Sequence, residues 1–516
     1  MANYKTPGVY IEEKNAFPNS VVAVETAVPA FIGYTEKAQK LGKNALNKPI
    51  RVTSMVEFEQ FFGEAPEYKF KIIEAAADDK ETFPLGSGKD KKEYTLQWSE
   101  KVYRLHNCVK HFYQNGGGNC WVVSVGDYNT AINKDSILAA VDNLVDEPEP
   151  TMVLSPDALA LPAAECFTVY TTILAHCKKM MSRIGVLDVP GADADKIFDP
   201  KDLIEKFRSG IGTNNLNYGS AYFPWLETNV VSDREVTFLN FDAGLKDLLS
   251  IGASDEAKAA VERAFKTAPI EDDPINKFKV FVLENGAEVE KSVDEAGLIS
   301  VDAGLRSIIP VYKSVIIKEA IKKVNLMPPA ASMAGVYTAV DNTRGVWKAP
   351  ANVSLNSVLA PNVNISNDFN NDLNMPLNGK AVNAIRTFPG QGTIVWGART
   401  LDGNSQDWRY INVRRTMIFL EMSVKAAAQA YVFEPNDANT WVLVSGMISN
   451  FLNNVWKAGG LFGSTPGEAY DVQVGLGTTM TANDILDGYM RITVRVAVVR
   501  PAEFIVITFQ QKMAEA

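Results

Sequence analysis

The chain has 516 residues, of which 46% are hydrophobic and 22% are charged, a composition typical of globular proteins and unlike that of disordered or collagen-like chains. Its 61 acidic residues outnumber its 51 basic residues, which excludes a general nucleic-acid coat and a polybasic membrane binder. Four cysteines are too few for a secreted disulfide framework, and no uncharged apolar run reaches the 18 residues of a membrane-spanning helix. We therefore expect no secretory signal and folding in a reducing cytoplasm.

Short apolar runs alternate with amphipathic ones from Phe31 to about Leu226. The runs expected to form buried strands are residues 30–34, 120–125, 152–154, 184–189 and 221–226. Helices are expected at about 163–181 and 202–208. Strands and helices in this alternation predict right-handed crossovers and a largely parallel sheet. The more polar residues 235–305 are expected to form a peripheral insertion.

The last third of the chain has a different composition. Asn, Pro and Gly are dense over residues 328–392, which predicts long ordered loops. Two amphipathic helices are expected at about 413–433 and 439–457. Apolar and polar residues then alternate over 491–498, as in a strand with one buried face. Because Pro501 interrupts this run, residues 504–509 are expected to form a separate strand.

Both ends of the chain carry apolar segments that favour strands. These residues are Val9, Tyr10 and Ile11 near the N-terminus and Phe504, Ile505, Val506, Ile507 and Phe509 near the C-terminus. Terminal segments usually fray unless they are docked, and an unpaired apolar strand promotes aggregation. The two segments therefore complete either this chain's own sheet or that of a neighbouring chain, and the residue pattern alone favours the first.

Residue patterns offer no complete catalytic, metal or cofactor site. Two histidines and two cysteines have a spacing that matches no common zinc motif: His106, Cys108, His111 and Cys120. Residues 86–90 resemble the end of a phosphate-binding loop, but Asp90 occupies the position that requires Ser or Thr. The glycines of residues 115–119 precede a strand, whereas dinucleotide loops follow one, so this segment is expected to be a tight turn with a positive φ.

Twelve sequence blocks, spread over both ends and the middle of the chain, resemble those of contractile tail sheath proteins and occur in the same order as in that family, whose single-use members form phage tails, R-type bacteriocins and phage-like contractile injection systems. The blocks are residues 6–13, 26–33, 58–63, 111–123, 328–329, 335–337, 344–352, 388–392, 395–400, 408–415, 433–437 with Trp441, and 500–505. The resemblance covers most of the chain except about 65–100 and 230–325. The blocks at 413–415, 433–437 and 500–504 are most similar to those of injection systems related to antifeeding prophages and virulence cassettes.

The resemblance implies an α/β fold in which an α+β inner domain carries an inserted α/β outer domain. Residues 1–29 would supply the N-terminal arm and a strand of the inner domain, residues 30–327 the outer domain with its insertion at 235–305, and residues 328–516 the inner sheath domain with a C-terminal arm. It also implies that the terminal arms are exchanged between subunits, which reverses the expectation from the residue pattern. The sheet that accepts the arms would present Ile492, Val494, Val496 and Val498.

The function implied by the resemblance is that of a structural subunit and not of an enzyme. Sheath proteins of this kind polymerise as six-start helical tubes around an inner tube protein and contract to drive it through a target envelope. The implied partners are further copies of the chain, the inner tube, baseplate and terminal cap proteins, and sheath paralogues, with no nucleic acid and no membrane insertion. Assembly would take place in a bacterial or host cytoplasm, as part of a phage tail or a released particle.

The two long helices of the inner domain are expected to lie nearest the inner tube. The residues chosen as candidates for this contact are Arg414, Arg415, Glu421, Lys425, Asn453, Asn454 and Lys457. The alternative function is an α/β enzyme whose Gly-rich loop binds a nucleotide or a sugar. Electron microscopy separates the two, because only a sheath subunit forms helical tubes.

Overall fold

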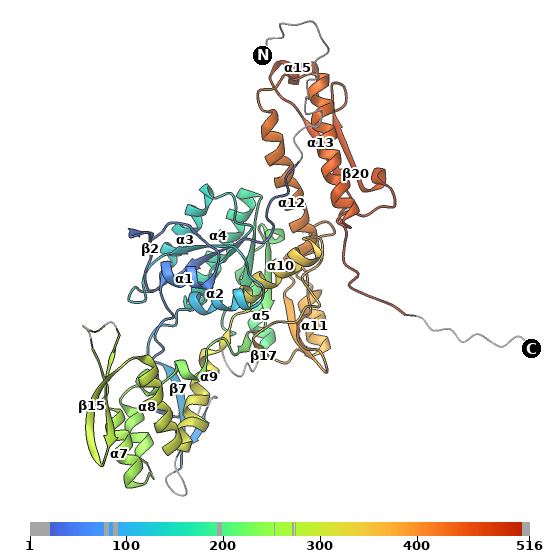
Figure 1. The fold of residues 1–516 in the computed structure, drawn as a ribbon. Coiled ribbons are helices and arrows are strands. Elements are labelled where there is room, and N and C mark those ends of the chain that lie inside the picture. The colour runs from blue at the N-terminus through green and yellow to red at the C-terminus, as the bar shows by residue number, and fades with distance from the viewer. Residues whose placement is uncertain are drawn as a thin grey trace, which may run out of the picture. The chain divides into compact units, whose positions relative to one another are not determined.

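The structure is a computed structural model that describes residues 21–76, 82–85, 91–192, 199–251, 253–270, 273 and 275–507 (Figure 1). The chain divides into two compact units. The α/β unit comprises residues 27–343 and 350–411, and the C-terminal unit comprises residues 1–26, 344–349 and 412–516. The C-terminal unit is therefore assembled from three separate stretches of sequence.

An eight-stranded sheet in the order β19-β18-β11-β10-β9-β1-β8-β4 forms the centre of the α/β unit. Its strands are β1 (Pro29–Gly33), β4 (Ile50–Val52), β8 (Cys120–Ser124), β9 (Met152–Leu154), β10 (Ile184–Asp188), β11 (Gly219–Phe223), β18 (Asn383–Phe388) and β19 (Gly392–Val395). The six inner strands are parallel, and β4 and β19 pair antiparallel at the two edges. The expected largely parallel sheet is confirmed.

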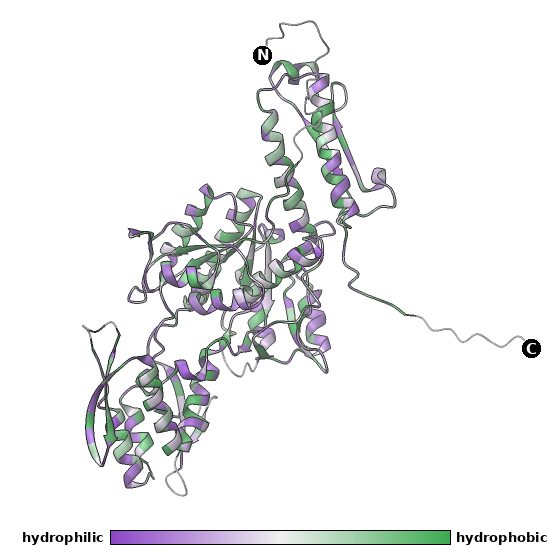
Figure 2. Ribbon diagram, viewed as in Figure 1, coloured by the Kyte–Doolittle hydropathy of each residue, from purple (hydrophilic) through white to green (hydrophobic). Residues whose placement is uncertain are grey.

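The inner strands are apolar along their length because a parallel sheet is covered on both faces. All five residues of β1, β10 and β11 are buried, and Figure 2 shows hydrophobic residues along the centre of this sheet. The helices of this part are α1 (Met55–Phe62), α2 (Leu105–Gln114), α3 (Lys134–Asn143), α4 (Ala163–Met180), α5 (Pro200–Gly210), α10 (Ala330–Arg344) and α11 (Asn367–Asn374). The predicted helices at 163–181 and 202–208 correspond to α4 and α5.

Helix α10 corrects the expectation of long loops over residues 328–392. Its first nine residues are all buried, so it shows no amphipathic period that a sequence pattern could reveal. Gly335 lies where a Cβ atom would come within 2.5 Å of the carbonyl oxygen of Phe112. The glycine that suggested a loop therefore permits close helix contact. The same stretch also contains α11, β17 (Val358–Pro361), β18 and β19.

A second hydrophobic core lies within the α/β unit and defines a lobe of its own. Its buried residues come from 68–96 and from 231–324, so the lobe is larger than the expected insertion at 235–305. Its elements are β5 (Phe70–Glu74), β6 (Phe83–Leu85), β7 (Lys92–Trp98), α6 (Gly244–Ser250), α7 (Asp255–Ala264), β13 (Ala268–Pro269), β14 (Phe278–Glu284), β15 (Ala287–Val293), α8 (Glu295–Ile308), a π-helix (Tyr312–Ile317) and α9 (Lys318–Val324). Smaller elements elsewhere in the unit are the hairpin of β2 (Gln39–Lys40) and β3 (Lys43–Asn44), and a sheet of β12 (Leu226–Thr228), β16 (Leu326–Met327) and β17.

The C-terminal unit is built on two long helices, α12 (Ile411–Ala428) and α13 (Ala438–Lys457). Both carry hydrophobic and hydrophilic residues, as expected for amphipathic helices (Figure 2), and they correspond to the predicted helices at 413–433 and 439–457. The carboxylate of Asp437 accepts a 3.0 Å hydrogen bond from the amide of Thr440 and caps α13. The other elements are α14 (Pro466–Ala469), β20 (Tyr470–Val474), α15 (Ala482–Leu486) and β21 (Ile492–Val496).

The division between the units differs from the expected boundary at residue 328. Residues 350–411 group with the α/β unit, because β18 and β19 extend its central sheet. The compact C-terminal unit is consequently smaller than the inner domain that was expected from the change in composition.

Candidate assembly surfaces

The residues that follow the N-terminal arm are docked on α12. The amide of Val24 donates a 3.3 Å hydrogen bond to Oγ of Ser423, and Nη2 of Arg415 donates a 3.0 Å hydrogen bond to the carbonyl oxygen of Thr26. Val21 and Val24 also pack against the core of the C-terminal unit. Val9, Tyr10 and Ile11, the predicted arm strand, lie outside the described residues.

Strands β20 and β21 form an antiparallel ribbon in which Tyr470 pairs with Val496 and Val474 with Ile492. The predicted strand at 491–498 is thus present as β21. Its alternate apolar residues Ile492, Val494 and Val496 are half-buried against the core, and the intervening residues are exposed. The partner strand β20 was not predicted, although its residues alternate apolar and polar in the same way. A two-stranded ribbon is only marginally stable by itself.

Further backbone hydrogen bonds continue the ribbon at one end, but no described strand pairs with either of its outer edges. The amide of Ala497 donates to the carbonyl oxygen of Ala469 at 2.9 Å, and the amide of Phe462 donates to the carbonyl oxygen of Ala497 at 2.7 Å. Val498 forms an isolated bridge with Leu461. No third strand pairs with β20 or β21 in the part of the chain that the structure describes. The outer edges of the ribbon therefore offer backbone groups to an incoming strand.

The C-terminal segment Phe504–Ile507 forms no strand within the chain. Its four apolar side chains are 67–87% exposed, whereas Phe509 lies outside the described residues. Exposing four consecutive apolar side chains forgoes the free energy of burying them, about 1.5–3 kcal/mol for each. The segment is therefore an unpartnered apolar surface, and its pairing with a neighbouring chain stays a prediction.

A strand of the second lobe shows how this chain protects an edge. β15 lies at the end of the β13-β14-β15 sheet and carries Glu288, Glu290 and Lys291, which pair with charged residues opposite or beside them. Charged side chains on an edge strand oppose pairing with another chain. The apolar segment 504–507 carries no charged side chain. Strand β15 is therefore expected to resist pairing with another chain, whereas segment 504–507 is expected to favour it.

The candidate tube-facing residues differ in their exposure. Arg414 and Arg415 are only 3% and 4% exposed, so the structure places them inside the protein and corrects the expectation that they face a partner. Glu421, on the next turns of α12, lies 4.0 Å from Nη2 of Arg414 with its side chain partly exposed. Lys425, Asn454 and Lys457 are exposed, and Asn453 is half-buried.

Helix α13 presents an exposed face almost without charge. Between Ala438 and Trp456 the helix contains no acidic or basic residue. Residues spaced by three or four positions lie on one side of a helix, and those exposed on this side are Val442, Gly446, Asn450, Asn454 and Lys457. Solvent-facing helices usually carry charges on their outer side. This uncharged side is a candidate contact surface.

The histidines and cysteines that suggested zinc do not form a site. Nε2 of His111 lies 3.3 Å from the carbonyl oxygen of Asn356, and Sγ of Cys120 lies 3.4 Å from the hydroxyl of Tyr113. Burial lowers the pKa of His106 and of His111 to about 4 and raises the pKa of Cys120 to about 12. Among the described residues, no three His, Cys, Asp or Glu side chains are placed to hold a metal ion.

The glycine segment at 115–119 connects α2 to β8 and is hydrogen-bonded to the loop around Asn356. Gly116 has a φ of 92°, as expected for a tight turn. The side chain of Asn115 donates a 3.2 Å hydrogen bond to the carbonyl oxygen of Asn356 and accepts a 2.8 Å hydrogen bond from its amide. The backbone amides of Gly116 and Gly117, the groups with which a glycine loop would bind a phosphate, donate instead to the carbonyl oxygens of Tyr113 and Phe112. The other glycine loop, residues 86–90, lies outside the described residues.

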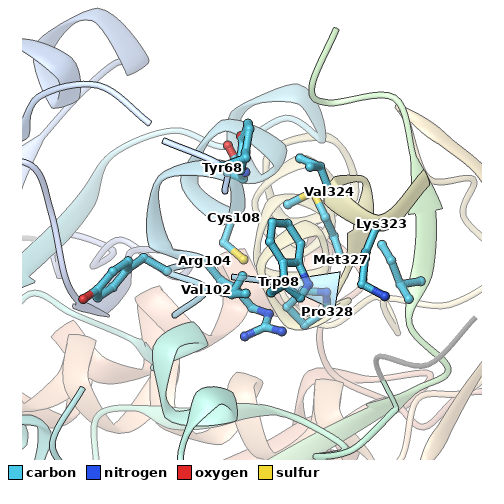
Figure 3. Close-up of a pocket in the computed structure, with 12 residues that line it drawn as sticks. Tyr68, Trp98, Val102, Arg104, Cys108, Lys323, Val324, Met327 and Pro328 are labelled. Atoms are coloured by element: carbon cyan, nitrogen blue, oxygen red, sulfur yellow. The ribbon is translucent and has the colours of Figure 1, made fainter. Parts of the chain in front are cut away.

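A small cavity lies between helix α2 and the second lobe (Figure 3). Its volume is about 40 Å³, enough for a few water molecules but not for a nucleotide or a sugar. Side chains from two distant parts of the chain line it, including Trp98 and Cys108 from one and Val324 and Met327 from the other. Burial holds the pKa of the Cys108 thiol well above its usual range, which disfavours the thiolate form that acts as a nucleophile.

A wider, open depression of about 530 Å³ lies in the second lobe. Its central group is Arg306, whose Nε donates a 2.5 Å hydrogen bond to Asp302 and whose Nη2 donates to the carbonyl oxygens of Asp233 and Val236. Asp302 also accepts hydrogen bonds from the amide of Phe238 and the hydroxyl of Tyr312. These polar groups hold the lobe together and leave little capacity to bind a ligand.

Comparison with known proteins shows similarity to phage tail sheath proteins over part of the chain. Residues 404–512 match the phage tail sheath C-terminal domain family. The chain is 26% identical over 136 residues to the tail sheath protein of Vibrio phage KVP40 and 26% identical over 147 residues to that of Salmonella phage ViI. These matches cover 26% and 27% of this chain and only 20% and 22% of the two phage proteins.

Two solved structures resemble the chain over nearly its whole length. One is the sheath complex of an extracellular contractile injection system, PVC, in the contracted state, with 26% identity, a TM-score of 0.59 and 99% coverage of both chains. The other is the helical sheath of the anti-feeding prophage in the contracted state, with the same identity and TM-score and coverage of 99% and 100%. The resemblance to contractile sheath proteins and the predicted fold class are confirmed.

Proposed function

We propose that this chain is the structural subunit of a contractile sheath. Many copies would form a helical tube around an inner tube, and shortening of the outer helical tube would drive the inner tube forward. The observation that carries this proposal is the similarity along the entire chain to sheath subunits of two injection systems. The enzymatic alternative receives no support from these relatives; the cavity beside Cys108 is too small for a nucleotide or a sugar, and the central polar groups of the larger depression, Arg306 and Asp302, bond to each other and to the lobe.

Strand exchange between copies is the proposed connection of the sheath. The ribbon β20–β21 has open edges, and the exposed segment 504–507 has the apolar, β-prone composition of a strand. Backbone hydrogen bonds between an arm and a neighbouring ribbon depend little on side chains. Such links would persist while side-chain contacts between copies are exchanged during contraction. The arm residues Val9, Tyr10 and Ile11 are proposed to take part in the same sheet.

The proposed contact with the inner tube is the exposed side of α13 from Asn450 to Lys457, which carries amide side chains and a single charge at Lys457. Amide side chains make hydrogen bonds that water can replace, so a contact of this kind is released more readily than a large apolar one. Lys425 of α12 is a second exposed candidate, and Glu421 a partly exposed one. Arg414 and Arg415 are not included, because they are buried.

Baseplate proteins are further proposed partners, since one of the similar structures is an anti-feeding prophage baseplate; a terminal cap and sheath paralogues are proposed from the resemblance of the sequence alone. Assembly is proposed to occur in the cytoplasm, in six helical starts, and to need neither a cofactor nor nucleic acid. None of the described helices is long and apolar enough to cross a membrane.

Negative-stain electron microscopy of the purified protein, alone and with its inner tube protein, tests the proposal. Helical tubes are the expected result. Discrete particles under all conditions, together with turnover of a nucleotide or sugar, would favour the enzyme instead.

A further inference from the structure

Two exposed apolar features of the chain have opposite charge. The first, the acidic tip, lies at the turn between α12 and α13 together with the end of α15. Its residues are Val432, Phe433, Glu434, Asp437, Leu486 and Asp487, and a cation beside them, Arg491, is paired with Asp484 of α15. The second, the basic hairpin, is the β2–β3 turn with its flanks. Its residues are Lys37, Lys40, Leu41, Lys43, Leu46 and Lys48.

The acidic tip is one surface because a single side chain ties its parts together. Nδ2 of Asn436 donates a 3.0 Å hydrogen bond to the carbonyl oxygen of Tyr489, and Oδ1 of Asn436 accepts a 2.7 Å hydrogen bond from the indole of Trp441. The amide of Tyr489 in turn bonds to the carbonyl oxygen of Asp484 in α15. Figure 1 shows α15 at the same end of the C-terminal unit as the start of α13. Phe433 and Leu486 are therefore held at one end of this unit.

Both features place a bulky apolar residue where the backbone favours Gly or Asn. Phe433 has a φ of 72° and a fully exposed side chain, and Leu41 has a φ of 52° and a side chain that is 90% exposed. Leu41 and Gly42 both have positive φ values, the geometry of a two-residue hairpin turn in which Asn-Gly is preferred. Each residue thus costs the isolated chain backbone strain without any gain from burial.

We propose that the acidic tip of one copy docks on the basic hairpin of a second copy, with Phe433 and Leu41 in the apolar centre and the charges around them. This inference rests on the proposed function and adds a lattice contact to strand exchange. The two surfaces are different, so the contact is head-to-tail, and a repeated head-to-tail contact builds a ring or an open helix rather than a two-fold symmetric dimer. The opposite charges favour this pairing over contacts between two tips or two hairpins.

Substitutions that relieve the backbone strain at Leu41 and Phe433 test the proposal, because they should leave the folded chain at least as stable while they weaken assembly. Leu41→Asn and Phe433→Gly each remove an exposed apolar side chain and suit the left-handed backbone. The melting temperature of the unassembled protein should stay the same or rise, while the yield of tubes falls at least about tenfold. Leu377→Asn, at another fully exposed leucine, is the matched control and should leave tubes intact.

Charge reversal tests the pairing itself. Glu434→Lys with Asp487→Lys, and separately Lys43→Glu with Lys48→Glu, should each abolish tubes at low salt. All four changes in one chain should restore them, because each reversed tip then meets a reversed hairpin. Asp437 and Asp484 are left unchanged because they cap α13 and α15. Failure of the fourfold variant to recover while the wild type forms tubes would overturn the pairing.

Disulfide trapping shows whether the contact is between copies. The four natural cysteines are buried, so engineered ones are the reactive thiols. When tubes are formed from a mixture of Leu41→Cys and Phe433→Cys chains and then oxidised, a covalent dimer should form several-fold more than with Leu377→Cys in place of Leu41→Cys. No excess over this control, or trapping of Phe433→Cys on a cysteine-scanned inner tube, would contradict the proposal. Absence of wild-type tubes would instead overturn the proposed function and this contact with it.

Discussion

The carboxylate of Asp188, at the end of β10, accepts a 2.7 Å hydrogen bond from the amide of Ala330, the first residue of α10. Asp157 acts similarly one strand away, where its carboxylate accepts a 2.7 Å hydrogen bond from the amide of Tyr34 and a 2.5 Å hydrogen bond from the amide of Arg104, just before α2. Both carboxylates are buried. Two buried acids thus hold helix N-termini against the carboxyl edge of the parallel sheet, where the helix dipole favours negative charge.

These acids make stability depend on pH. Burial raises the pKa of Asp188 to about 7 and that of Asp157 to about 6, although the backbone hydrogen bonds oppose the increase. The folded chain therefore binds more protons than the unfolded chain between about pH 4 and 7, and this contribution to stability is lost as the pH rises. We expect the free energy of unfolding to fall between pH 6.5 and 8 by on the order of 1 kcal/mol. Urea titrations of the wild type and Asp188→Asn should give a flatter profile for the variant, and identical profiles would contradict the prediction.

The buried histidines act in the opposite direction. Burial lowers the pKa of His106, His111 and His176 to about 4. Between pH 6.5 and 4 the unfolded chain therefore binds more protons than the folded chain, and stability is lost as the pH falls. His111→Gln keeps a donor for the carbonyl oxygen of Asn356 and should lose less stability on acidification than the wild type. Thermal melts at pH 7 and pH 5 measure this difference, and an equal loss in both proteins would argue against it.

Proline substitutions in the C-terminal segment should prevent assembly without unfolding the chain. Ile505→Pro with Ile507→Pro removes two backbone donors, each worth about 1 kcal/mol net in a strand pairing, from residues that form no strand within the chain. We expect an unchanged melting temperature and no tubes in electron micrographs. Ile505→Val with Ile507→Val keeps the β-prone character and should still assemble. Tubes formed by the proline variant would show that the segment is not an exchanged strand.

Deletion of residues 1–20 should have a similar outcome. The described chain is docked on α12 from Val21 onward through Val24 and Thr26, so the core should not depend on the residues before it. A linker as long as residues 14–20 spans up to about 25 Å when fully extended. We expect a cooperative melt and no tubes, measured by calorimetry and microscopy. Normal polymerisation of the truncated chain would exclude the N-terminal arm from the connection.

Cross-linking should identify the side of α13 that faces the inner tube. Asn454→Cys carrying a photoreactive maleimide should label the tube protein in extended particles, because Asn454 lies on the exposed, uncharged side of the helix. Asp135→Cys, on the exposed part of α3 in the α/β unit, is the matched control. Labelling only from the control position would place the tube contact on the other unit.

The sequence allowed much of the fold to be predicted, because parallel strands leave an unmistakable apolar run. β8, β10 and the helices α4, α12 and α13 all lie close to their expected positions. Helix α10 was missed because it is buried on nearly every side and its Gly335 and flanking prolines resemble a loop. β20 was also missed, although Tyr470, Val472 and Val474 alternate with polar residues as a half-buried strand requires.

The candidate surfaces were harder to predict because exposure depends on tertiary structure. Arg414 and Arg415 read as solvent-facing charges on a helix, yet the first turns of α12 are buried around their whole circumference. Phe433 reads as a core residue by composition, yet its side chain is fully exposed. The sequence already shows that residues 438–456 of α13 carry no charge. This becomes informative only when the structure shows which side of the helix is exposed.

The three-part construction of the C-terminal unit has a mechanical consequence. The chain passes between the two units four times, at residues 26/27, 343/344, 349/350 and 411/412. A force that pulls the units apart is therefore shared by four segments of the chain, and each segment limits how far the other three can extend. Units joined by four linkages in parallel resist being pulled apart more strongly than units joined by a single linker.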